Sequence, residues 1–67
     1  MKLTRISQLS GKAHTMDLPI TEEQLWRYEN TDEKVQDIFP DLPAPQREFI
    51  MTGITPEEWK EAFSLNE

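Results

Sequence analysis

The stretch KLTRISQLSGKAHTMDL, residues 2–18, decides the fold class, because this is where strands are expected. Ser10-Gly11 is its strongest turn signal, and the flanking segments contain no proline and alternate partly in polarity. His14, Met16 and Leu18 are spaced two apart, so in a strand they share one face. These features predict a β-hairpin with one apolar side.

The first arm of this hairpin is open to a second interpretation. Leu3, Ile6 and Leu9 do not alternate, and their spacing of three suits a helical turn as well as a strand. The chain is therefore predicted to be an α+β domain in which an N-terminal β-hairpin packs against three or four short helices. An all-α fold is the alternative.

The rest of the chain, residues 21–65, carries helix signals. Thr21-Glu22-Glu23-Gln24 has the pattern of a capping box and predicts a helix from Glu22 to about Glu29. Thr55-Pro56-Glu57-Glu58 repeats the pattern, with proline at the first helical position, and predicts a last helix from Pro56 to about Ser64.

Two shorter helices are predicted between these boxes. Thr31 or Asp32 can cap a helix that Pro40 ends, and Pro45 can open another that Gly53 stops in a left-handed conformation. The apolar side chains of the hairpin and the helices should form one core. Its expected members are Leu18, Ile20, Leu25, Val35, Ile38, Phe39, Leu42, Phe49, Ile50, Ile54, Trp59 and Phe63.

Length and composition bound the function. The chain has 67 residues, no cysteine and a single histidine, His14. A domain below about 70 to 80 residues rarely supplies more than ~3 to 5 kcal/mol of stability, which disfavours a buried catalytic cleft. We therefore predict one small domain, residues 1–67, that is not an enzyme and holds no metal or cofactor. With no cysteine, no signal segment and no long apolar run, a cytoplasmic location is expected.

Charge is distributed unevenly along the chain. The hairpin segment, residues 1–19, contains Lys2, Arg5 and Lys12, and residues 1–16 have a net charge of +3. Residues 17–67 contain all 13 acidic side chains and have a net charge of -9. A nucleic-acid-associated protein that uses the three cations is one alternative function, although no aromatic residue lies among them to stack on bases. An acidic inhibitor that imitates DNA is another.

The aromatic residues of the first helix are candidates for partner binding. Leu25, Trp26 and Tyr28 cover a wide arc of that helix, which a small domain cannot readily bury. Trp26 and Tyr28 are therefore predicted to contact a protein partner, and a weak homodimer is one expected form of that contact. The alternative is that Trp26 packs on the hairpin.

Two longer segments carry a resemblance to a known family. SGKAHTM, residues 10–16, and REFIMTGITPEEW, residues 47–59, resemble a family of short bacteriophage-encoded proteins of unknown activity. The resemblance implies a phage or prophage origin and transfers no functional residue to this chain. The leading functional hypothesis is a non-enzymatic phage-type accessory protein that binds itself, a host protein or a phage protein in the host cytoplasm.

Overall fold

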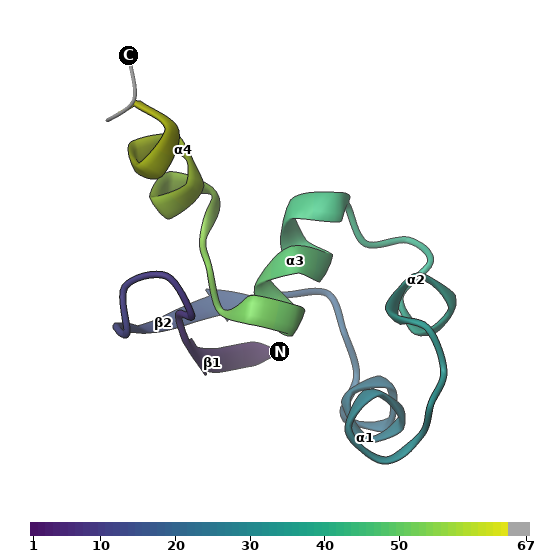
Figure 1. The fold of residues 1–67 in the computed structure, drawn as a ribbon. Helices are drawn as coiled ribbons and strands as arrows, with labels where there is room; N and C mark the ends of the chain where they lie inside the picture. Colours follow the sequence, from purple (N-terminus) through teal and green to yellow (C-terminus); the bar gives the residue numbers. More distant parts are fainter. Residues whose placement is uncertain (65–67) are drawn as a thin grey trace.

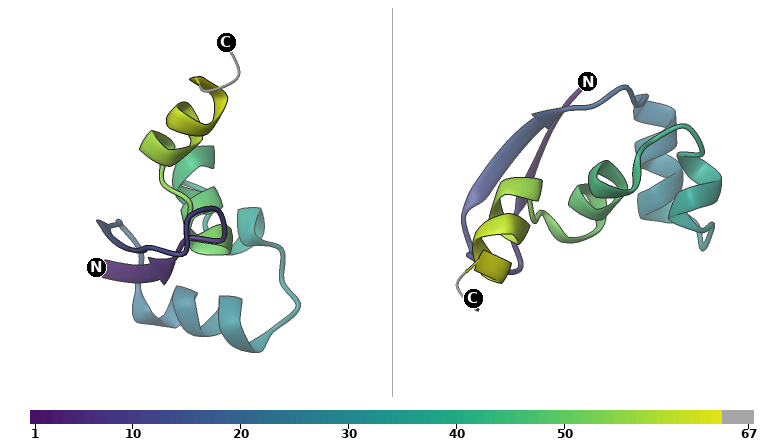
Figure 2. Two further views of the ribbon diagram at one scale, coloured as in Figure 1. Left: turned by 60° about the vertical axis from the view of Figure 1, so that its left-hand side comes forward. Right: turned by 90° about the horizontal axis from the view of Figure 1, so that it is seen from above.

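The computed structural model describes residues 1–64 and has an α+β fold, as predicted. Strands β1 (Lys2–Ile6) and β2 (Ala13–Asp17) form an antiparallel hairpin at the N-terminus. Four helices follow, α1 (Glu22–Asn30), α2 (Val35–Ile38), α3 (Ala44–Thr52) and α4 (Pro56–Ser64). Figures 1 and 2 show α3 beside the hairpin, α1 and α2 together at one end of the molecule, and α4 at the other end. The expected end of the helical segment at Leu65 lies outside the described residues.

The register of the hairpin explains the irregular pattern of its first strand. Leu3 lies opposite Met16, and Arg5 lies opposite His14, so these four side chains share the inner face. Leu3 is buried in the core, although the predicted core omits it. A charged side chain at an inward position breaks the expected alternation, and Ile6 is left on the exposed face.

Helix α1 (Glu22–Asn30) begins at the predicted capping box. The Gln24 backbone N–H donates to the Thr21 hydroxyl at 3.1 Å, and the Thr21 N–H donates to the Gln24 side chain at 3.0 Å. The prediction that Thr31 or Asp32 caps the next helix is wrong. Thr31 instead ends α1, because its hydroxyl donates to the Arg27 carbonyl.

Helix α2 (Val35–Ile38) is a single turn, shorter than predicted. Its N-cap residue, Lys34, makes no side-chain capping bond, and its C-cap residue, Phe39, directly precedes Pro40. A helix this short is held by the burial of its apolar side chains rather than by its ends. Ile38 and Phe39 supply that burial.

Helix α3 (Ala44–Thr52) ends at Gly53, and helix α4 (Pro56–Ser64) begins three residues further along the chain. Gly53 has φ 75°, and its N–H donates to the Phe49 carbonyl at 2.8 Å. The predicted left-handed stop is therefore confirmed, because glycine adopts this conformation without a Cβ penalty. Helix α3 starts one residue earlier than predicted, so that Pro45 is its second residue.

Backbone contacts fasten the end of α3 to the hairpin. The Gln8 N–H donates to the Thr52 carbonyl at 3.0 Å. At Gly53, a Cβ would lie 2.4 Å from the carbonyl oxygen of Ile6. The chain thus needs glycine here for two reasons, the positive φ and the close approach of β1.

The core lies between the hairpin, α1, α2 and α3, and Phe49 at its centre is 0 % exposed. Phe63 is 64 % exposed, and Trp59, on which it stacks, lies outside the buried core, so the predicted places of both in the core are wrong. Figure 1 shows the reason: α4 leads away from the core, in a molecule of 40 × 20 × 20 Å. No helix within residues 1–64 has the length and hydropathy to span a membrane. The buried hydrophobic residues are Leu3, Leu18, Ile20, Ile38, Phe39, Leu42, Phe49, Ile50 and Ile54.

Candidate protein-binding surface

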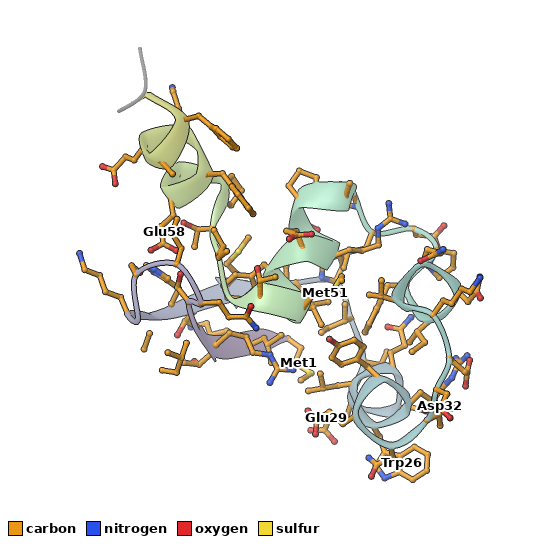
Figure 3. The ribbon with its side chains drawn as sticks, in the orientation of Figure 1. Met1, Trp26, Glu29, Asp32, Met51 and Glu58 are labelled. Carbon is orange, nitrogen blue, oxygen red and sulfur yellow. The ribbon has the colours of Figure 1, made fainter. Side chains whose placement is uncertain are left out.

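The two aromatic side chains of α1 lie on different sides of the helix. Successive residues of a helix are rotated by about 100°, so Leu25 and Tyr28 share one side while Trp26 falls on the other. Tyr28 packs toward the core, with its ring centroid 6.4 Å from that of Phe39. Trp26 is 60 % exposed and does not pack on the hairpin. Figure 3 shows its side chain pointing away from the body of the protein.

Acidic side chains surround the exposed indole. Glu22, Glu23 and Glu29 lie four residues before, three before and three after Trp26, which are the neighbouring positions on a helix surface. All three are exposed. We call the group formed by Trp26, these three glutamates and Asn30 the Trp26 surface.

The helix that carries this surface is fixed at its C-terminal end. The Asn30 side chain donates to the Trp26 carbonyl at 2.9 Å. Arg27 and Glu33 form a two-pronged ion pair, and the guanidinium holds the pKa of Glu33 below its usual range. The indole is therefore presented on a helix whose last turn is tied to the following loop.

The chemistry of the Trp26 surface suits a basic side chain. A Lys or Arg side chain placed over an indole is attracted by the negative face of the ring. Glutamates around the ring add charge attraction and hydrogen-bond acceptors. An aromatic centre with a polar rim is also the usual arrangement of a protein interface.

The cations predicted to bind nucleic acid do not form one patch. Lys2 and Lys12 are exposed at opposite ends of the hairpin. Arg5 lies on the inner face of β1, where its guanidinium is 3.7 Å from the Glu29 carboxylate. The hairpin therefore presents separate positive charges rather than a continuous track for a phosphate backbone.

A polar cluster that sequence reasoning missed joins the hairpin turn to α4. Glu58, in the first turn of α4, receives a hydrogen bond from the Ser10 hydroxyl and lies 3.1 Å from His14 Nε2. Its side chain is only 12 % exposed. Ser10 and Glu58 are 48 residues apart, and no local pattern links them.

Serine, histidine and glutamate together invite comparison with a hydrolase triad. In such a triad the histidine stands between the serine and the acid, where it can take the serine proton. Here the Glu58 carboxylate stands between Ser10 and His14. The arrangement ties two elements together and leaves the serine hydroxyl without an imidazole base.

The cluster lowers the pKa of Glu58 from 4.5 to about 2. The Ser10 hydroxyl is the main cause, and partial burial opposes it by favouring the neutral acid. Ser7 and His14 lower the pKa further, as does the backbone N–H of Thr55. The ionised carboxylate is thus the form that holds α4 to the hairpin turn.

This pKa predicts a specific acid sensitivity. Because the folded-state pKa is depressed, the carboxylate stabilises the fold above pH 4.5, and that contribution is lost as the pH falls toward about 2. The free energy of unfolding should therefore fall more steeply with acid in the wild type than in Glu58→Gln. Denaturant titrations across this pH range measure the difference. Glu57→Gln, an exposed neighbour in the same turn, should keep the wild-type slope, and a wild-type slope in Glu58→Gln would contradict the cluster.

Neither a search for metal ligands nor comparison with known proteins identifies a further site within residues 1–64. Among residues 1–64, no group of three His, Asp or Glu side chains is arranged to hold a metal ion. Comparisons with protein-family models, curated proteins and solved structures gave no match to the chain. The candidate site therefore rests on geometry alone.

Proposed function

We propose that this protein is a small non-enzymatic accessory protein that binds a basic segment of another protein through the Trp26 surface. The observation that carries the proposal is the 60 % exposed indole of Trp26 on a well-capped helix. The resemblance of residues 10–16 and 47–59 to phage-encoded proteins supports a host or phage partner in the cytoplasm of a bacterial cell.

The charge of the protein supports a basic partner. The chain has a net charge of -6, which speeds the approach of positively charged molecules. The glutamates around Trp26 place part of that charge beside the aromatic contact. Complementary charge then selects the partner, and burial of the indole holds it.

A second aromatic group outside the core lies on α4, where Phe63 is exposed and Trp59 is partly buried. The rings of Trp59 and Phe63 are stacked, with centroids 5.7 Å apart. This pair gives a matched comparison, because Phe63 is as exposed as Trp26. It lies on a helix at the other end of the domain (Figure 3).

The proposal predicts a selective loss in affinity capture. Wild-type protein, Trp26→Ala and Phe63→Ala serve as baits in lysate of a bacterial host, with recovered proteins quantified by mass spectrometry. The partner should be a protein with a basic segment that wild type and Phe63→Ala recover and Trp26→Ala does not. Once purified, it should bind Trp26→Ala at least about 30-fold more weakly than wild type, the effect of removing a hot-spot side chain.

Other results of these experiments would place the interface on a different surface or contradict the proposal. Equal recovery by wild type and Trp26→Ala, with loss only in Phe63→Ala, would move the interface to α4. Sedimentation at several concentrations tests whether the partner is a second copy whose Lys2 or Lys12 meets the Trp26 surface. Nucleic acid bound with a strong salt dependence would contradict the proposal and favour the alternative based on the hairpin cations.

A further inference from the structure

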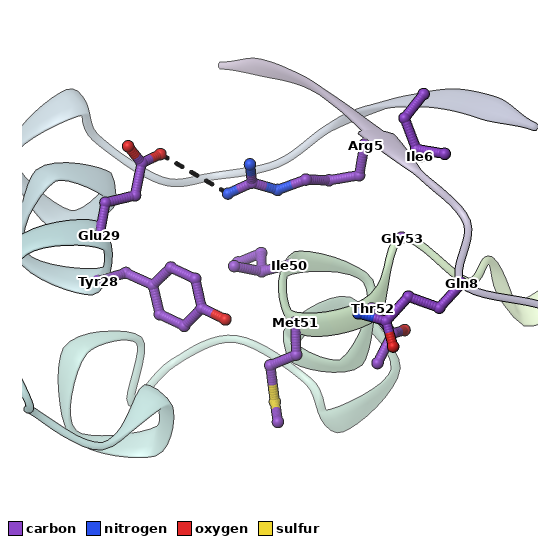
Figure 4. A pocket seen from close by; sticks show the side chains of 9 residues that line it. All are labelled: Arg5, Ile6, Gln8, Tyr28, Glu29, Ile50, Met51, Thr52 and Gly53. Carbon is purple, nitrogen blue, oxygen red and sulfur yellow. Dashed lines mark ion pairs between the residues drawn. The ribbon is translucent and has the colours of Figure 1, made fainter. Parts of the chain in front are cut away.

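A hollow of about 270 Å³ lies where β1, α1 and the end of α3 meet. Its charged groups are the guanidinium of Arg5 and the carboxylate of Glu29, and Ile50 and Met51 form an apolar wall (Figure 4). The neutral polar side chains in its lining are those of Gln8, Tyr28 and Thr52. Glu29 belongs to the Trp26 surface as well, whereas the Trp26 side chain itself points away from the body of the protein (Figure 3). We propose that this hollow binds a free α-amino acid with an apolar side chain.

Arg5 supplies the first reason. Its Nε is buried and has no hydrogen-bond partner among the described residues. Its contact with Glu29, at 3.7 Å, is longer than a hydrogen bond. Buried donors are normally paired, so the guanidinium is not saturated by the fold. The Arg5 side chain is 29 % exposed, and the terminal nitrogens of its fork match an α-carboxylate that enters from the hollow.

Glu29 decides the class of ligand. A simple anion bound to Arg5 would be repelled by the Glu29 carboxylate and by the net charge of -6. A simple cation bound to Glu29 would be repelled by the Arg5 guanidinium. A zwitterion avoids both penalties. Its α-carboxylate accepts from Arg5, and its α-ammonium donates to Glu29.

The apolar lining of the hollow and its volume determine which side chain the bound amino acid can have. Ile50 is buried beneath the hollow, and Met51 is exposed at its edge. At ~30 Å³ for each water of the liquid, the hollow has room for about nine waters. That volume suits a free amino acid the size of leucine or methionine, whose side chain would replace water on Ile50 and Met51.

Nuclear magnetic resonance titration of ¹⁵N-labelled protein with L-leucine tests the proposal. We expect saturable shifts at the amides of Tyr28, Ile50 and Met51. Leucine amide and N-acetyl-leucine each lack one of the two charges, and both should bind about tenfold more weakly or worse. The same derivatives represent the N-terminal and C-terminal residues of a peptide, so they distinguish a free amino acid from a chain end.

Variants separate the site from a general effect on the fold. Arg5→Gln and Glu29→Gln should each weaken L-leucine binding at least about tenfold, while Lys2→Gln, on the outer face of the same strand, should bind as wild type. If Arg5→Gln does not fold, Glu29→Gln decides, because that side chain is at the surface of α1. No saturable shift at about 10 mM L-leucine, equal binding of N-acetyl-leucine, or full binding by Glu29→Gln would overturn the proposal.

Discussion

Gly53→Ala is expected to lower the free energy of unfolding by about 3 kcal/mol or more, which is most of what a domain this small possesses. Alanine at φ 75° costs ~1 to 2 kcal/mol by itself. The added Cβ would also lie 2.4 Å from the Ile6 carbonyl oxygen, so α3 and β1 would have to separate. Circular dichroism and urea denaturation measure the loss.

Gly11→Ala is the matched control for this prediction. Gly11 has the same φ of 75°, but a Cβ there would have no atom within 4 Å. Its loss should therefore be limited to the conformational cost of ~1 to 2 kcal/mol. Equal losses in the two variants would mean that Gly53 does not pack against the hairpin as described.

Phe49→Ala is expected to cost ~3 to 5 kcal/mol, because it removes a completely buried ring from the centre of the core. Phe63→Ala makes the same chemical change at a site that is 64 % exposed. It should cost less than about 1 kcal/mol, the value of its stacking on Trp59. Urea denaturation of both variants gives the comparison, and similar large losses would place α4 against the core.

Local signals predicted most of the secondary structure. The capping boxes at Thr21 and Thr55 and the stop at Gly53 are confirmed, because each depends on residues within about one turn of helix. Which helix a threonine between two helices caps is harder to predict. Thr31 could open one helix or close another, and the sequence pattern does not distinguish these uses.

Features that depend on distant residues could not be predicted. The spacing of Trp59 and Phe63 correctly indicates one face of a helix, but not whether the core extends far enough to cover it. Arg5 interrupts the strand pattern because it reaches toward Glu29 on α1. The contact of Ser10 with Glu58 likewise requires the tertiary fold.

The exposure of Trp26 could be predicted from the sequence, whereas its contact with a partner stays a prediction. Trp26 was expected to contact a partner because one helix face could not hold both Leu25 and Trp26, and its exposure agrees with that reasoning. The same reasoning predicts a partner contact for Tyr28, whose ring lies against Phe39 at the edge of the core. The glutamates at three and four residues from Trp26 were visible in the sequence, yet their relevance depends on the indole being exposed.

The fluorescence of Trp26 during partner binding tests the proposed function most directly. Trp59→Phe leaves Trp26 as the sole tryptophan, and it retains an aromatic ring beside Phe63. Titration of this variant with the purified partner should shift the emission to shorter wavelength and protect the indole from acrylamide quenching, both saturating with binding. A partner that binds, as judged by sedimentation, while Trp26 emission and quenching stay unchanged would contradict the account.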